Sequence, residues 1–361
     1  MSARGKATAL GALLTVSLLC AAHPAVAQLQ WSSKDGSQTF KIGLLGQPQA
    51  EKADIAGSKD TADNLFMRRL RVLMGFTLSD NVSVFLETDS PNLGKATAGV
   101  KDAGNVFIQD FVATYKFSQA FMVDGGMLLV DDTYNHMQSA ATLLPVDYGP
   151  YTFNEGAALG ERVGRDYGAR IRGYLGGDHL EYRFGVLQGV RGPTASNDFE
   201  YTARLMYSFF TPPVGLFYRG TSLGKTQTLS LGASYDSQKQ YDNVGADLFW
   251  DQPVGGGNGF TLQADYNQID GGTFITSLPK QTNTLIEAGF FIAPAKLQPF
   301  LQWANENFKD PARIDETRTA VGLAYYMAGH NDNVKLSYTR IEPKHGDSRH
   351  QINLQWQVFQ F

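Results

Sequence analysis

Apolar and polar residues alternate one by one through most of this chain, a pattern typical of β-strands with one apolar and one polar face. In residues 64–78, leucine, valine, methionine and phenylalanine occupy one face, while arginine, glycine and threonine occupy the other. The pattern predicts about 16 strands of about ten residues each, the length of a tilted membrane-spanning strand. They are expected at 38–47, 64–78, 81–88, 105–117, 121–128, 166–175, 179–188, 199–209, 226–235, 241–250, 259–269, 282–292, 297–305, 317–328, 333–341 and 350–361.

The segments between these strands alternate mostly between short turns and long loops. The short turns include Ser79-Asp80, Ser118-Gln119 and Gly176-Gly177-Asp178. Outer-membrane barrels show this asymmetry, with short periplasmic turns and long outer loops. Two connections are exceptions: 210–225 is too long for a turn and predicts an irregular extension, and 236–240 is short for an outer loop. The long loops are expected at 48–63, 89–104, 129–165, 270–281, 306–316 and 342–349.

Both ends of the chain point to export into an outer membrane. Residues 1–27 have the features of a secretory signal peptide, with Arg4 and Lys6 before a short apolar run and a small-residue cleavage site at Ala25-Val26-Ala27. The chain ends on alternating residues and a terminal aromatic, Phe361, where soluble proteins usually have a frayed polar tail. We therefore expect a signal peptide at 1–27 and one β-barrel domain at 28–361 in the outer membrane of a Gram-negative bacterium.

The register of the last predicted strand has two interpretations. Its outward-facing set is most simply Ile352, Leu354, Trp356 and Val358, which leaves the final two phenylalanines, Phe359 and Phe361, out of phase. Either a β-bulge lies near Gln357, or the closing strand is read on the other face.

Composition excludes several function classes. The one cysteine, Cys20, falls within the predicted signal peptide, so the mature chain has none for a disulfide, a thiolate metal site or a cysteine nucleophile. Removing Arg4 and Lys6 changes the formal net charge from −4 to −6, and a mildly acidic exported chain is a poor binder of nucleic acid. The 38 glycines and 12% aromatic residues fit twisted strands with aromatic girdles.

The longest predicted loop, 129–165, is the third outer loop. A barrel of about 16 strands encloses an aqueous lumen, and a loop of this length in a compact fold is usually functional. We expect it to fold into the lumen and to form a short helix at 139–144; the alternative is a loop that lies over the mouth or against a neighbouring subunit. The acidic residues expected at the resulting constriction are Asp131, Asp132, Asp147 and Glu155.

A set of arginines is expected on the lumen wall opposite this loop. A cation at the middle of the lipid face would cost roughly 2–4 kcal/mol, so the lumen is strongly preferred. A basic wall facing an acidic loop would create a transverse field, and rings of arginine favour anions. The alternative is that the arginines pair with lumen acids such as Glu87, Glu181 and Glu200 and only stabilise the barrel. The arginines are Arg69, Arg71, Arg170, Arg172, Arg183 and Arg204.

The sequence contains no recognisable motif for catalysis or for a cofactor. Its five mature histidines lack metal-ligand spacing, and it has no HExxH, G-x-S-x-G, P-loop or haem-attachment motif. We expect no cofactor, no metal and no enzymatic activity. One alternative is a barrel enzyme whose site is assembled across strands. Another is a structural barrel or sheath for a redox or surface partner, which a narrow or plugged lumen would indicate.

Several segments resemble a known family of channels. The run from Asn64 to Arg71, leading into Gly75-Phe76, resembles the opening of the phosphate-selective porin O/P family and related Gram-negative porins. The run from Tyr218 to Lys225, followed by 231–236 and 245–249, is similar to the middle of such porins. The resemblance implies a 16-stranded trimer whose phosphate-binding members use an arginine ladder and lysines at the constriction. The predicted wall arginines could match the ladder, but residues 129–165 contain no lysine.

The sequence as a whole therefore predicts a trimeric outer-membrane porin that passes small hydrophilic solutes by diffusion, with anions preferred if the arginine wall faces the pore. The expected partners are outer-membrane lipid and lipopolysaccharide, small hydrophilic solutes or anions, and two further copies of the chain.

Overall fold

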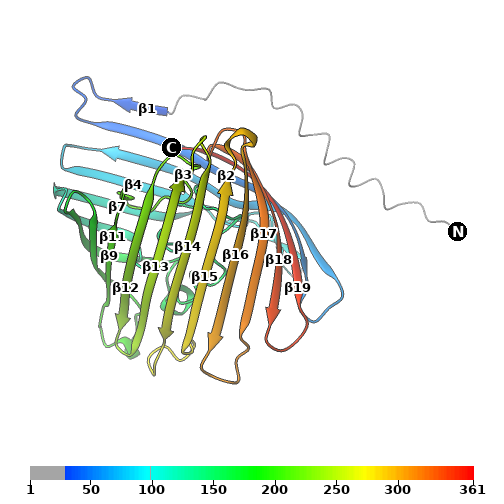
Figure 1. The fold of residues 1–361 in the computed structure, drawn as a ribbon. Coiled ribbons are helices and arrows are strands. Elements are labelled where there is room, and N and C mark those ends of the chain that lie inside the picture. Colours follow the sequence, from blue (N-terminus) through cyan, green and yellow to red (C-terminus); the bar gives the residue numbers. More distant parts are fainter. Residues whose placement is uncertain (1–28, 98) are drawn as a thin grey trace.

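The computed structural model describes residues 29–97 and 99–361 and shows a closed antiparallel barrel (Figure 1). Sixteen strands pair in chain order, and β19 pairs with β2 to complete the ring, which confirms the predicted fold class. The predicted signal peptide at 1–27 lies outside the described residues. The barrel strands are β2 (Thr39–Asp54), β3 (Thr61–Thr77), β4 (Val82–Asp89), β7 (Phe107–Ser118), β8 (Phe121–Leu129), β9 (Arg165–Leu175), β10 (Leu180–Leu187), β11 (Glu200–Ser208), β12 (Thr228–Gln238), β13 (Tyr241–Pro253), β14 (Gly259–Asp270), β15 (Gln281–Phe291), β16 (Leu297–Phe308), β17 (Glu316–Tyr326), β18 (Asp332–Pro343) and β19 (Arg349–Gln360).

Each strand has an apolar face outside the barrel and a polar face inside. In β11, Tyr201 and Leu205 are half exposed on the outside, whereas Glu200, Thr202 and Arg204 are buried inside. Large apolar side chains are exposed in the same way on every barrel strand from β7 to β19. So much contiguous apolar surface is incompatible with water, so the outer face is one that lipid must cover.

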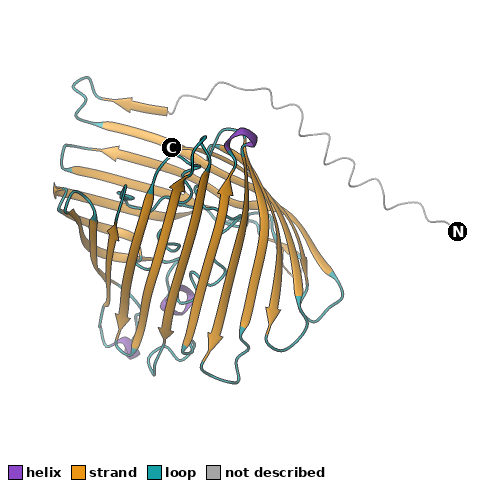
Figure 2. Ribbon diagram, viewed as in Figure 1, coloured by secondary structure: helices purple, strands orange, loops and turns teal. Residues whose placement is uncertain are grey.

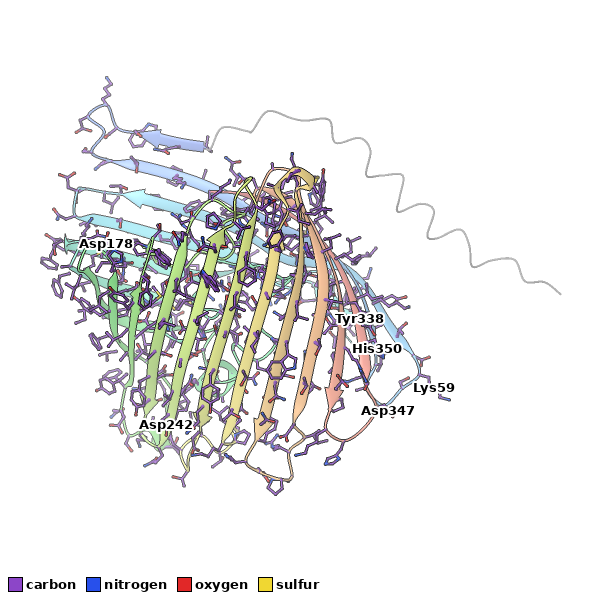
Figure 3. The ribbon with its side chains drawn as sticks, viewed as in Figure 1. Lys59, Asp178, Asp242, Tyr338, Asp347 and His350 are labelled. Atoms are coloured by element: carbon purple, nitrogen blue, oxygen red, sulfur yellow. The ribbon has the colours of Figure 1, made fainter. Side chains whose placement is uncertain are left out.

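The short turns and the long loops lie at opposite ends of the barrel. Asp178, in the turn between β9 and β10, lies at the other end from Lys59 and Asp347, which belong to the loops after β2 and β18 (Figure 3). Asp242, beside the short 239–240 connection, lies at the long-loop end (Figure 3). We call this end the outer mouth and the opposite end the inner mouth.

The prediction of a long loop at 48–63 is wrong, because β2 continues to Asp54 and β3 already begins at Thr61. Gln49 and Glu51 still face the interior. The alternate positions, Ala50 and Lys52, hold a small and a polar residue where a membrane-spanning strand would have large apolar ones. These two strands extend past the apolar belt of the barrel. Their ends are still β-strands, but they lack the alternation of apolar and polar residues by which the sequence pattern identifies a strand.

Three short strands were not expected. β1 (Leu29–Ser32) forms a hairpin with the start of β2 and lies in line with the end of β19, since β19 reaches β2 only as far as Leu44. β5 (Ala96–Thr97) and β6 (Val100–Lys101) form a small hairpin within the outer loop after β4. The helical pieces are single turns: α1 (Gly156–Leu159), η2 (Pro193–Ala195) and η3 (Ala293–Ala295). None of the helices in the described part of the chain is long and apolar enough to span a membrane.

The last strand keeps one register along its whole length. The pairing of β19 with β2 runs from Gln351 with Ala53 to Gln360 with Leu44 without a shift, so there is no bulge at Gln357. Ile352, Trp356 and Val358 are exposed outside, as predicted. The closing strand is not read on the other face either, so both interpretations are wrong: the two final phenylalanines simply continue the inward-facing set of Gln355 and Gln357. Phe361 lies over Phe85, with ring centroids 5.8 Å apart, at the inner mouth.

Candidate functional site

The third outer loop, residues 130–164, lies inside the barrel. Its Asn135 amide donates to Asp265 of β14, and Lys335 of β18 donates to the carbonyls of Leu143 and Pro145 at 2.5 and 2.8 Å. On the other side of the ring, Arg170 of β9 bonds the loop residue Asp131 at 2.6 Å, so the loop crosses the lumen between β9 and β18. Figure 2 shows teal loop segments and a helical turn between the front and back walls.

The predicted helix at 139–144 is wrong. This stretch is irregular, and the one α-helical turn of the loop is α1 at Gly156–Leu159. The carbonyls that a helix would use internally are bound by wall side chains instead: Gln47 donates to Ala140, and Gln357 donates to Ala141 at 2.8 Å. Competition from well-placed side-chain donors removes the hydrogen bonds that would hold a helical turn.

A β-bulge aims two consecutive arginines at the loop. The register between β2 and β3 shifts between Gln47 and Pro48, so that Arg68 is the extra residue on β3. Strict alternation would send Arg68 outward, but the bulge lets both Arg68 and Arg69 reach Asp147, at 2.6 and 2.5 Å. Burial alone would raise the pKa of Asp147, but the two guanidiniums outweigh it and hold the pKa well below its usual range.

The predicted arginines on β9, β10 and β11 form one row. Arg172, Arg183 and Arg204 stand opposite one another in neighbouring strands, and all three are buried. Like charges at this spacing repel, and each has a carboxylate partner: Arg172 with Asp124 at 2.7 Å, Arg183 with Glu181 at 2.6 Å and Arg204 with Asp247 at 2.6 Å.

The remaining predicted arginines are paired in the same way. Arg170 bonds Asp124 at 2.8 Å and the loop residue Asp131 at 2.6 Å, and Arg71 bonds Glu87 and Asp89 at 2.6 and 2.9 Å. Arg69 and Arg170 therefore pair with acids of the third loop, whereas Arg71, Arg172 and Arg204 pair with acids of the barrel wall. That the arginines attract anions stays a prediction.

The predicted acids of the loop have different surroundings. Asp147 is about one-third exposed, whereas Asp131, Asp132 and Glu155 are buried. Asp132 accepts hydrogen bonds from Ser234 and Asn267 of the wall. Of the four predicted constriction acids, Asp147 is the one that lines the open cavity described below.

A second segment, 209–227 between β11 and β12, enters the lumen from the inner mouth. Its Tyr218 is fully buried, donates its hydroxyl to Glu181 at 2.6 Å and accepts from Arg204 at 2.9 Å. The sequence indicated the excess length of this connection and a family resemblance from Tyr218 onward, but not that Tyr218 would lie in the lumen between Glu181 and Arg204. An aromatic residue beside Arg219 in so long a connection was the one available signal.

The inner segment and the third loop pair by their backbones. The amide of Tyr218 donates to Met137, and the amide of Ser139 donates to Tyr218, at 2.8 and 2.9 Å. Gly220 lies so close to Thr142 that an added Cβ would stand 1.9 Å from its carbonyl oxygen. The side chains between the two segments, among them Tyr134, Met137 and Tyr218, are fully buried.

An open cavity of about 470 Å³ remains on the outer side of the third loop. We call it the vestibule; it is lined by β2, β3, β16 to β19 and the loop tip, including Gln302, Thr339 and Asn353. Its charged lining residues are four cations against two anions: Arg68, Arg69, Lys95, Arg318, Glu51 and Asp147. The vestibule therefore carries excess positive charge, and its floor contains Asp147 with its two partners Arg68 and Arg69.

Solved structures of porins share this fold. An anion-selective porin from Comamonas acidovorans matches with a TM-score of 0.64 and 11% identity, over 90% of this chain and all of that chain. OmpF of Salmonella typhi matches with a TM-score of 0.59 and 13% identity, over 92% of this chain and all of that chain. The trimer form of OmpT of Vibrio cholerae matches with a TM-score of 0.56 and 10% identity, over 90% of this chain and all of that chain.

No family model matches the sequence, and no curated protein matches it. At such low sequence identity the structural matches establish the fold alone. The specific resemblance to phosphate-selective porins stays a prediction. The chain has the fold of the general Gram-negative outer-membrane porins, a closed antiparallel barrel of sixteen strands.

Proposed function

We propose that the protein is an outer-membrane porin that passes small hydrophilic solutes by diffusion. The observation that carries the proposal is the barrel itself, with an apolar exterior, a polar interior and a loop inside that leaves an open vestibule. A sixteen-stranded barrel is wide enough for an aqueous path. Because the third loop contacts opposite walls, we expect that path to be narrow and the conductance to be small.

Anion preference is the second part of the proposal. The vestibule carries four cationic side chains against two anionic ones, and a net positive entrance raises the local anion concentration. The Comamonas acidovorans structure with the same fold is an anion-selective porin. The third loop contains no lysine, so we propose a general channel in preference to a phosphate-selective one.

We also propose a homotrimer embedded in outer-membrane lipid and lipopolysaccharide, after removal of the signal peptide at 1–27, and no enzymatic activity. One of the structures with this fold is a trimer form. The exposed apolar residues of the exterior support contact with lipid.

Planar-bilayer recording tests the channel and the trimer together. Purified protein should insert and give small conductance steps in groups of three, with a reversal potential in a salt gradient that indicates anion preference. Protein that is folded by circular dichroism yet gives no steps would refute the channel.

The same recording distinguishes the channel from a second candidate function, a structural sheath or surface receptor. The third loop and the inner segment fill much of the lumen, and such a plugged barrel is what a structural sheath or surface receptor would have. If the folded barrel stays silent in the bilayer, this second function is favoured.

A further inference from the structure

A cluster of carboxylates lies apart from the vestibule, at the outer ends of β11 and β12. It consists of Glu161 from the third loop, Glu200 at the start of β11 and Asp236 near the end of β12. One ligand oxygen from each of the three lies within 4.8 Å of the others. The sequence did not indicate this cluster, because its members are 75 positions apart at the extremes and share no motif.

Most of the carboxylate oxygens of this cluster lack a hydrogen-bond donor among the described residues. Glu200 is fully buried, and neither of its carboxylate oxygens has a hydrogen-bond donor among the described residues. The same holds for both oxygens of Glu161 and for Oδ1 of Asp236. A buried carboxylate without a donor or a cation is strongly unfavourable, so these groups need a compensating positive charge.

Neighbouring groups do not supply that charge. Asp132 and Asp166 add further negative charge close by, and burial beside Asp236 raises the pKa of Glu161 well above its usual range. Arg165, the cation whose charge acts on Glu161, already forms an ion pair with Asp110 at 3.2 Å.

We propose that Glu161, Glu200 and Asp236 bind a divalent cation of the calcium class, which fastens the third loop to β11 and β12. Oxygens around one Ca²⁺ lie about 2.3–2.6 Å from the ion, so two of them can be as far as about 5 Å apart. The observed spacing fits that limit. Three carboxylates, each able to bind through two oxygens, suit a hard cation better than zinc or copper.

A neighbouring group is a weaker candidate. Asp132, His136 and Glu155 also lie within 4.8 Å of one another. However, Asp132 already accepts hydrogen bonds from Ser234, Asn243 and Asn267. Glu161 and Glu200 have all four oxygens free of hydrogen bonds among the described residues, which places the cation with them.

The site lies close to the outer mouth. The carboxylate oxygens of Glu161 are buried, but Gly160 and Arg162 on either side of it are exposed. Tyr241 lies on the buried side, where its hydroxyl donates to Asp236 at 2.7 Å. This tyrosine is a natural sensitiser for a luminescent lanthanide that replaces the cation.

Calorimetry on the full-length mature chain tests the proposal. The protein is refolded in detergent without lipopolysaccharide, treated with a chelator and titrated with CaCl₂, with MgCl₂ as a comparison. Wild type should bind one Ca²⁺ per chain with saturation. Glu200→Gln and Asp236→Asn should each weaken binding at least tenfold, while Asp347→Asn, in an exposed outer loop, should not change it (Figure 3).

A luminescence measurement with Tb³⁺ tests the same site without depending on variants that fold poorly. Tb³⁺ should give luminescence excited through tyrosine, and Tyr241→Phe should abolish that signal while directly excited Tb³⁺ emission still reports binding. Glu200→Gln that retains wild-type affinity would overturn the proposal. So would wild type that takes up protons with falling pH but binds no Ca²⁺, because protons alone would then neutralise the cluster.

Discussion

Tyr218 shows how one side chain joins the wall to both inner segments. Its hydroxyl bridges Glu181 and Arg204, its ring lies 5.2 Å from the guanidinium carbons of Arg183 and Arg204, and it stacks on Tyr134. Hydrogen bonds to charged groups contribute about 1.5–3 kcal/mol each. Tyr218 is therefore the residue on which the packing of the inner segment depends most.

Replacing Tyr218 by phenylalanine should lower the free energy of unfolding by about 2–4 kcal/mol, because two charged groups lose a buried hydrogen-bond partner. Urea unfolding in lipid vesicles, followed by tryptophan fluorescence, measures the change. Tyr207→Phe on the lipid face of β11 is the matched control and should shift stability by less than about 0.5 kcal/mol. Equal effects of the two substitutions would contradict this role.

At the vestibule, single charges should set ion selectivity. Asp147→Asn removes an anion beside Arg68 and Arg69, so anion permeability should rise; Arg68→Gln should lower it. An interaction of about 1 kcal/mol between unit charges 4 Å apart in water corresponds to a change on the order of fivefold in the permeability ratio. Reversal potentials in a salt gradient measure it.

The buried arginines provide the comparison. If Arg71→Gln and Arg170→Gln leave the reversal potential unchanged while Arg68→Gln moves it, then the arginines buried in the wall only stabilise the barrel. Removing one partner of a buried ion pair costs about 3–5 kcal/mol, so each of these variants also needs a stability measurement.

At the scale of elements, the third loop is held in place by a small number of wall side chains. Lys335 is buried and donates to two carbonyls at the loop tip, and Gln47 and Gln357 bind the preceding stretch. These donors lie on β18, β2 and β19, which leaves the loop tip fixed beneath the vestibule.

Lys335→Met keeps the side-chain length but removes the donor, so the loop tip should loosen and single-channel conductance should rise, with more frequent fluctuations. Lys344→Met, at an exposed position of the outer loop after β18, is the control. Unchanged conductance in Lys335→Met would mean that the loop tip does not limit the path.

The sequence pattern predicted the strands well because each transmembrane strand must alternate between lipid and lumen. It failed where that constraint ends. The strand β2 continues past the apolar belt to Asp54, where both faces meet water or polar groups. The bulge at Arg68 and the irregular stretch at 139–144 depend on contacts with residues far away in the chain, such as Gln357, and no local pattern reports these contacts.

On the scale of the whole molecule, the barrel is a polar-lined cylinder occupied from both mouths. The third loop enters from the outer mouth and the inner segment from the other, and they meet at Met137 and Tyr218. The proposed cation site ties the first of these to the wall on one side, and Lys335 ties it on the other. The open vestibule is the part of the interior that this arrangement leaves to solutes.

The meeting of these two segments inside the ring also has a consequence for folding. The pair that closes the barrel, Gln351 with Ala53, joins residues almost 300 positions apart, and such distant contacts form slowly. The backbone bonds between Met137 and Tyr218 lie inside the closed ring. A barrel whose inner segments already pair would offer β19 and β2 a preformed interior to close around, so we expect loss of the contact between Met137 and Tyr218 to slow closure of the ring.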